Sequence, residues 1–247
     1  MARTIGFTLA LLALPSALSG QMLAQRIAAL GEGNIRLSFA AREGVCGSSH
    51  GITISDHSDE WVGDCERGPV RVSLHVRGGR LTEANTHVGG RWRPTTGHTV
   101  DLGMLPARSA ASDLLALAER SDADADDLIT AATLADSATV WPTLLRLARS
   151  PAVPLETRRQ AVFWLGQAAG DAAARGLDSI AVDPTGDLEV RKQAVFALSQ
   201  RPAEEGVPAL IRIARTNRHG ELRKAALFWL GQSEDPRALA LFEEILR

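Results

Sequence analysis

A ten-residue pattern that occurs three times constrains this chain more than any other feature of its sequence. The copies RRQAVFWLGQ, RKQAVFALSQ and RKAALFWLGQ begin at Arg158, Arg191 and Arg223. In the first copy, Ala161 and Leu165 are four positions apart, which places both side chains on one face of an α-helix. A unit that recurs about every 33 residues is typical of stacked helical repeats, in which neighbouring units bury each other's apolar faces.

Further helices are expected between and around the copies. Residues 206–215 and 236–246 carry apolar side chains at helical spacing, and Asp235 is placed to cap the second of these. A less regular unit spans residues 126–148, and residues 113–119 are expected to form a leading cap helix. The sequence therefore predicts an all-α solenoid of about four helix pairs over residues 112–247.

The segment DLEVRKQAVFAL at residues 187–198 resembles the first-helix signature of HEAT-like repeats, the kind shared with phycobilisome-lyase-type HEAT proteins. In that family an acidic residue, an arginine and an Ala…Leu pair recur in each repeat. The resemblance covers slightly over half of the chain and implies a HEAT-type solenoid. It implies little about function, because HEAT arrays serve many unrelated roles.

The preceding residues, 25–105, have a strand-like pattern instead. Apolar residues alternate with polar ones over residues 69–76, and Gly78-Gly79 suits the tight turn of a hairpin. Further strands are expected at residues 34–40, 51–55, 81–88 and 100–105. The predicted fold class is therefore α+β with two domains: a small β-rich domain at 25–105, a linker at 106–111 and the solenoid.

The first 19 residues have the pattern of a secretory signal peptide, with Arg3, an apolar run from Ile5 to Leu14, and Pro15. Cleavage after Ser19 fits the small-residue rule best, and cleavage after Ala24 is a weaker alternative. An ordinary amphipathic N-terminal helix is the other interpretation. No later apolar run reaches 18 residues. We therefore expect a periplasmic or secreted protein whose mature chain does not span a membrane.

The two cysteines, Cys46 and Cys65, are expected to form a disulfide if the chain is exported. Such a bond would close a loop of roughly 20 residues and contribute about 3 kcal/mol. The alternative is a pair of reduced, buried thiols. The spacing is not that of a redox-active Cys-x-x-Cys pair.

The β-rich region contains five of the six histidines, and several acidic residues lie near them. A metal or catalytic site at His50, His57 and Asp64 is conceivable, but the spacing matches no known ligand pattern, so a polar loop is the simpler interpretation. No catalytic, cofactor-binding or metal-binding residue is predicted. The other three histidines of this region are His75, His87 and His98.

The repeated helices carry aromatic residues that are candidates for binding a partner. Apolar residues surround the helix at residues 161–165, although a helix of a two-layer solenoid should keep a polar face. Either these side chains pack deeply between helices, with the phenylalanines stacked as a ladder, or they form a docking strip for the β-rich domain or another protein. The candidates are Phe163, Trp164, Phe196, Phe228 and Trp229.

Three acid–base pairs accompany these aromatics at a spacing of i,i+3, and their first members are Glu156, Glu189 and Glu221. Salt bridges that support each helix are the favoured interpretation. A basic stripe for an acidic partner is the alternative, and it is disfavoured because a glutamate accompanies each cation.

The composition and the repeats together favour a binding function. The net charge of −2 gives no reason to expect nucleic acid. The iron-binding His-Glu pairs of the HEAT enzyme deoxyhypusine hydroxylase are missing, because His219 is the single histidine after residue 111. Bilin lyases act inside the cell, which conflicts with export. We therefore predict a non-catalytic, cofactor-free module for protein–protein interaction or scaffolding; the alternative is an enzyme or metal-binding module in the histidine-bearing domain.

Overall fold

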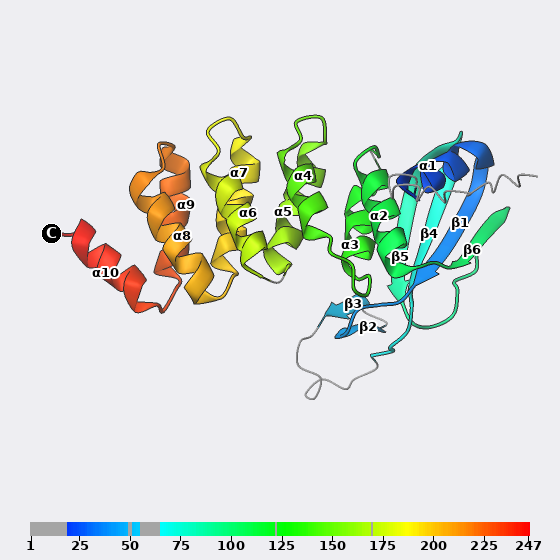
Figure 1. Ribbon diagram of the computed structural model, residues 1–247, viewed down its shortest axis with the longest axis horizontal. Coiled ribbons are helices and arrows are strands. Elements are labelled where there is room, and N and C mark those ends of the chain that lie inside the picture. The colour runs from blue at the N-terminus through cyan, green and yellow to red at the C-terminus, as the bar shows by residue number, and fades with distance from the viewer. Residues whose placement is uncertain (1–18, 49–50, 55–64, 122, 169) are drawn as a thin grey trace, which may run out of the picture.

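The computed structural model describes residues 19–48, 51–54, 65–121, 123–168 and 170–247. A small sheet with one helix is followed by a row of helices, as Figure 1 shows. The predicted α+β class is confirmed. The first region contains α1 (Ser19–Leu30), β1 (Glu32–Phe39), β2 (Val45–Ser48), β3 (Gly51–Ile54), β4 (Val70–Arg77), β5 (Arg80–Val88) and β6 (Thr99–Met104).

Four of the strands form one sheet in the order β5-β4-β1-β6. Strand β1 pairs antiparallel with β4 and parallel with β6. Alternate side chains of β1 and β4 are buried, as the sequence pattern predicts, and Leu23 and Ile27 of α1 join the same core. One face of the sheet is therefore apolar. The buried strand residues are Ile35, Leu37, Phe39, Val70, Val72, Leu74 and Val76.

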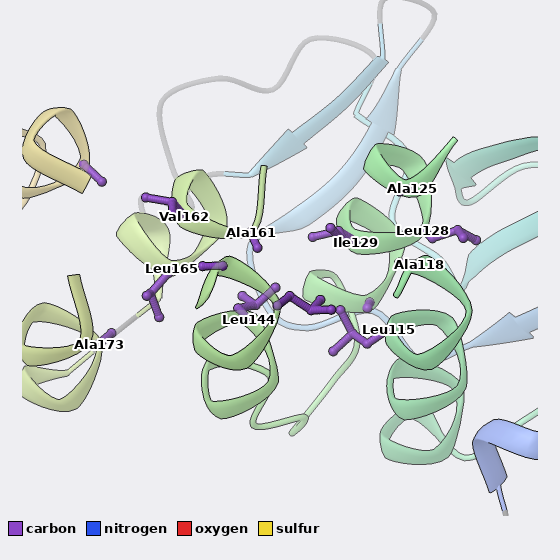
Figure 2. Packing of buried hydrophobic residues seen from close by; sticks show 14 of the residues in the cluster. Leu115, Ala118, Ala125, Leu128, Ile129, Leu144, Ala161, Val162, Leu165 and Ala173 are labelled. Atoms are coloured by element: carbon purple, nitrogen blue, oxygen red, sulfur yellow. The ribbon is translucent and has the colours of Figure 1, made fainter. Parts of the chain in front are cut away.

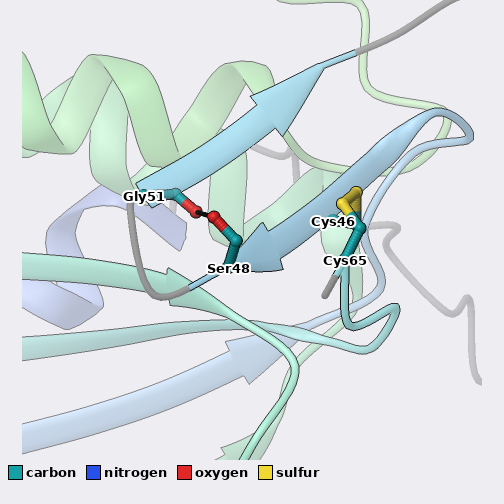
Figure 3. Close-up of a disulfide and its surroundings, with 4 residues drawn as sticks. All are labelled: Cys46, Ser48, Gly51 and Cys65. Atoms are coloured by element: carbon teal, nitrogen blue, oxygen red, sulfur yellow. Dashed lines mark hydrogen bonds between the residues drawn. A yellow bond between two sulfur atoms is a disulfide. The ribbon is translucent and has the colours of Figure 1, made fainter. Parts of the chain in front are cut away.

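Strands β2 and β3 form a separate antiparallel hairpin, and only β3 was expected. Cys46 on β2 is joined to Cys65 by the predicted disulfide, with the two Cα atoms 5.4 Å apart (Figure 3). Gly47 and Glu66 exchange two backbone hydrogen bonds beside this bond, of 2.9 and 2.7 Å. A Cβ atom at Gly47 would lie 2.2 Å from the carbonyl oxygen of Val88, so only glycine fits against β5 here.

The remaining helices form two layers. Helices α3, α5, α7 and α9 contact one another in sequence, and α4, α6 and α8 do the same on the other side. Consecutive helices pack most closely as the four pairs α2–α3, α4–α5, α6–α7 and α8–α9, and α10 follows these pairs. Their bounds are α2 (Ala107–Ala118), α3 (Ala125–Thr133), α4 (Trp141–Arg149), α5 (Leu155–Gln167), α6 (Asp171–Val182), α7 (Leu188–Ser199), α8 (Ala203–Thr216), α9 (Gly220–Gly231) and α10 (Pro236–Ile245).

The repeated alanine and leucine build the core between the layers. Ala161 and Leu165 are fully buried, and so are their counterparts in α7 and α9. Figure 2 shows Ala161 and Leu165 of α5 among the buried side chains, with Leu144 of α4 and Ala173 of α6 nearby in the other layer. Gly166 lets α5 approach α7 closely, because a Cβ atom there would lie 3.0 Å from the Cβ atom of Ala197. The counterparts are Ala194, Leu198, Ala226 and Leu230.

The expected linker at residues 106–111 is wrong. Pro106 occupies the N-cap position of α2, and residues 107–111 are its first turns, with Ala110 and Ala111 buried. Proline suits a helix start, and alanine-rich residues favour the helix that follows. The solenoid therefore begins about five residues earlier than expected and is joined to the sheet without a spacer.

The sheet and the helices share one continuous core. Backbone hydrogen bonds join them directly: Arg42 N–H donates to Leu134 O, and Asp136 N–H donates to Ala40 O. The backbone N–H of Ala84 on β5 also donates to Asp124 Oδ2, at 2.8 Å, just before α3. The first helices of the row are thus held against the edge strand β5 and the segment that follows β1.

Candidate functional site

The outer face of α5, α7 and α9 repeats the same four kinds of side chain. In α5 they are Glu156, Arg159, Phe163 and Gln167, spaced three, four and four residues apart, which places them along one side of the helix. Equivalent positions recur in the next two helices, which lie beside α5 in the same layer. These are Glu189, Lys192, Phe196 and Gln200 in α7, and Glu221, Lys224, Phe228 and Gln232 in α9.

The charged positions of this face are paired within each helix. Arg159 lies 3.1 Å from Glu156, Lys192 lies 3.2 Å from Glu189, and the third pair, Lys224–Glu221, measures 3.1 Å. The prediction of helix-supporting salt bridges is therefore confirmed. Each cation has a carboxylate partner, so the face offers no unbalanced charge to an acidic ligand.

We call the five candidate aromatic residues, Phe163, Trp164, Phe196, Phe228 and Trp229, the aromatic face. Phe228 is 57% exposed, whereas the other four are half-buried. The ring centroid of Trp229 lies 5.1 Å from that of Phe196 and 4.9 Å from that of Phe228. Phe163 and Trp164 form a separate pair at 5.4 Å. Exposure thus increases toward the C-terminal helices.

The expected ladder of stacked phenylalanines is not what the described residues form. Their ring contacts join phenylalanine to tryptophan, and Trp229 bridges Phe196 of the previous copy and Phe228 of its own. The position after the phenylalanine holds Trp164 and Trp229 in two copies but the small Ala197 in α7. Phe196 therefore has no tryptophan next to it in its own copy, and its ring contact is with Trp229 of α9.

The repeated arginine and acidic residue have structural roles at the start of the helices. Asp187 caps α7 by accepting hydrogen bonds from the N–H groups of Glu189 and Val190. Arg191 is buried, and its Nε donates to Ala181 O at 3.2 Å. Its Nη2 lies 3.5 Å from Oδ1 of Asn217 in the next repeat. These contacts join consecutive repeats, so Asp187 and Arg191 of the signature stabilise the fold.

A cavity of about 470 Å³ lies at the junction of α1, the sheet and α2. Leu37, Leu102 and Leu105 give it an apolar floor, and Arg26 and Asp101 lie at its edge. The residue pattern did not indicate this cavity, because it depends on α1, which was not expected, and on the early start of α2.

The histidines do not form a metal site in the part of the chain that the structure describes. No group of three or more His, Cys, Asp or Glu residues is close enough there to hold an ion. His50, His57 and Asp64, the residues considered for such a site, lie outside the described residues. His87 instead lies edge-on to the ring of Trp92, with the two centroids 5.7 Å apart.

Comparison with known families adds to this geometry. A family model of HEAT repeats matches residues 179–247, which extend from the end of α6 to α10. The C-terminal region of this protein consists of HEAT repeats. This match confirms the resemblance seen in residues 187–198. Helices α3–α6 continue the same two layers toward the sheet, and we call the whole row α3–α10 the HEAT region.

Searches of curated proteins and of solved structures found no match to the chain. Among the described residues, no helix combines the length and apolar character that crossing a membrane requires.

Proposed function

We propose that this protein binds another protein through the aromatic face of its HEAT region and acts as a non-catalytic scaffold. The observation that carries the proposal is Phe228, which is 57% exposed although it belongs to a repeated apolar position. Exposed aromatic rings held rigidly by their neighbours are typical centres of protein interfaces, since their burial releases much apolar area at a small cost in side-chain entropy.

The surroundings of Phe228 support this role. Trp229 packs against it and limits its motion, while the Glu–Lys pair of α9 lies one to two turns away along the same side. A rigid apolar centre within a polar and electrically neutral rim is the usual arrangement of an interface. HEAT repeats in general mediate protein–protein interactions. The partner that fits is a protein with an apolar segment, without a requirement for net charge.

Photo-crosslinking tests this proposal directly. A photoreactive phenylalanine analogue placed at position 228 is expected to crosslink one reproducible protein in the native cell envelope. The matched control is the same analogue at Val182, which is 43% exposed at the end of α6 in the other layer. Equal patterns of crosslinks from the two positions would refute the aromatic face as the binding site.

A double variant gives an independent measurement. Phe196→Ser with Phe228→Ser should weaken binding to the crosslinked partner by at least tenfold, since each buried aromatic contributes on the order of 1–3 kcal/mol. The control Val182→Ser should bind like the parent. Circular dichroism and the melting temperature establish that the double variant is folded, and unchanged binding by a folded variant contradicts the proposal.

We also propose that the protein works in the periplasm or outside the cell. The disulfide between Cys46 and Cys65 supports an oxidising compartment. Leu23 and Ile27 of α1 are buried in the sheet core, so signal-peptide cleavage after Ser19 would preserve this packing, whereas cleavage after Ala24 would remove Leu23. The intact mass of the protein tests this: a chain that starts at residue 20 fits the proposal, one that starts at residue 25 shows cleavage after Ala24 and loss of the Leu23 packing, and one that starts at residue 1 argues against export.

A further inference from the structure

The second face of the four-stranded sheet carries a group of arginines around one tryptophan. Gly89 and Gly90 both have positive φ angles, and they turn the chain after β5 into the segment that holds Trp92. The ring centroid of Trp92 lies 5.1 Å from the guanidinium carbon of Arg36 on β1 and 5.2 Å from that of Arg71 on β4. Such cation–π contacts hold the ring close to both cations.

Two more arginines, Arg91 and Arg93, flank Trp92 and are exposed. We call Arg36, Arg71, Arg91 and Arg93 the basic face. The ion pairs that the described residues form all lie between residues 119 and 244, so none neutralises these arginines. Two guanidinium groups, those of Arg36 and Arg71, therefore lie against the ring, and none of the four arginines has a carboxylate within ion-pair distance among the described residues.

The nearby carboxylates are engaged with backbone groups. Glu66 Oε1 accepts a hydrogen bond from Gly90 N–H at 2.8 Å. Asp101, the register partner of Arg36 on β6, accepts one from Gly103 N–H, also at 2.8 Å. Both acids thus stabilise turns, and neither forms an ion pair with the four arginines.

The pKa of His87 also reflects the positive charge of these arginines. Its pKa lies below the ordinary value because of burial first, and then because of the charges of Arg93 and Arg71; a backbone hydrogen bond with Arg91 acts in the opposite direction. Its Nε2 atom is buried without a hydrogen-bond partner among the described residues. Burial disfavours any charge at this position, but the part of the shift that comes from Arg93 and Arg71 is a positive potential, which favours an anion nearby.

Arg36 and Arg71 differ in which of their nitrogen atoms already donate hydrogen bonds. Arg36 uses Nη2 to hold the tryptophan segment, donating to Arg93 O at 2.7 Å and to Thr95 Oγ1 at 2.9 Å. Arg71 donates only through Nε, to Gly89 O at 3.2 Å. Its two terminal nitrogens have no hydrogen-bond partner within the described part of the chain, and they form the flat end of the fork that binds an oxyanion in a bidentate manner.

We infer that the basic face binds a doubly charged oxyanion of the phosphate type, with Arg71 as the bidentate ligand and Arg93 and Arg91 as the flanking cations. Arg36 and Trp92 position these groups. A dianion fits better than a single carboxylate, because the arginines of the basic face have no ion-pair partner among the described residues and a doubly charged group is attracted more strongly to them. The anion is either free phosphate or a phosphate monoester on a larger molecule.

Isothermal titration calorimetry and a thermal-shift assay of the full chain test this inference, with inorganic phosphate and phenyl phosphate as probes at constant ionic strength. We expect saturable binding of at least one of the two probes, and the tighter one identifies the source. The variants Arg71→Gln and Arg93→Gln should each weaken it about tenfold, the value of one charge-assisted hydrogen bond. The control Arg80→Gln removes the same charge at the far end of the β4–β5 hairpin and should bind like the parent.

NMR titration of His87 provides a second measurement that does not depend on affinity. Bound phosphate should raise its pKa, since an anion offsets the charges of Arg71 and Arg93 that lower it. A response that is not saturable, or one that Arg71→Gln and Arg80→Gln reduce equally, would overturn the inference and leave only general screening of a basic protein surface.

Discussion

The sheet region and the HEAT region differ in how far along the chain their stabilising contacts extend. Strand β1 pairs with β4 and with β6, and these partners lie roughly 40 and 65 residues away. Helix α7 contacts α5, α6, α8 and α9, which are its neighbours in sequence. The sheet must therefore form as a whole, whereas a repeat array is stabilised by each unit and its neighbours. Equally destabilising substitutions should therefore affect the whole sheet in one region but only the neighbouring helices in the other.

Matched leucine substitutions test this contrast with the largest expected effect. Leu74 of β4 and Leu198 of α7 are both fully buried, and Leu→Ala should cost about 2–5 kcal/mol at either site. Hydrogen exchange should show that Leu74→Ala lowers protection throughout the sheet, while Leu198→Ala lowers it mainly in α6–α9. If Leu198→Ala exposed the sheet equally, the HEAT region would be one cooperative unit with it, and the contrast would fail.

Removal of the disulfide tests whether the sheet region depends on a covalent tie that the repeats lack. The Cys46→Ser, Cys65→Ser double variant should lose about 3 kcal/mol, because a loop of this length is restricted in the unfolded chain. Urea unfolding followed by proteolysis should place the loss in residues 32–104. Loss of protection in α7–α10 of a similar size would show instead that the two regions unfold together.

The two regions also differed in how well the sequence predicted them. Three copies of one decapeptide gave the positions of α5, α7 and α9, because local periodicity and neighbour packing agree there. The alternation in β1 and β4 was also clear, whereas that in β5 was blurred and its position followed from the Gly78-Gly79 turn. Helix α1 and strand β2 were missed: no helix was expected after the export signal at residues 1–19, and residues 45–48 contain small residues without alternation. Their structures depend on partners far away in sequence.

The two candidate sites also differ in how far they could be predicted from the sequence. The aromatic residues could be found from the sequence, because a repeated position that is apolar all round the helix stands out. Their true contacts could not, since the contact between Trp229 and Phe196 joins two different helices and depends on how these helices pack. The basic face gave no local signal at all: Arg36, Arg71 and Arg93 come together only when β1, β4 and the segment after β5 assemble.

Asp124 offers a smaller test at the border of the two regions. Its side chain accepts the hydrogen bond of Ala84 N–H, and its backbone has a positive φ of 49°. Asp124→Ala should cost about 1–3 kcal/mol through the unpaired donor on β5. The comparison is Asp187→Ala, which removes the cap of α7 and should cost about 1 kcal/mol. Thermal unfolding compares the stabilities of the two variants. A greater loss of stability from Asp187→Ala would contradict a close packing of the sheet region against the first helices.

The smallest expected effect concerns the acidic residues at the start of α3, and it depends on pH. Partial burial of the carboxyl group, then the charges of Asp124, Asp126 and Glu83, raises the pKa of Asp127. The folded chain thus holds this proton more tightly than the unfolded chain, so the group's contribution to stability falls as pH rises from the unfolded pKa through the raised folded pKa.

Asp127→Asn fixes the side chain in its neutral form and should raise the melting temperature slightly at pH 7. The gain should vanish below pH 3.8, the ordinary pKa, because the aspartate is then protonated in both states. A favourable interaction of the charge with the helix N-terminus opposes this gain, so the sign of the change at pH 7 shows which effect is larger. A lower melting temperature there would mean that the favourable interaction of the charge with the helix N-terminus, a local feature, is larger than the effects that raise the pKa, which are burial and the neighbouring carboxylates, including Glu83 on the sheet.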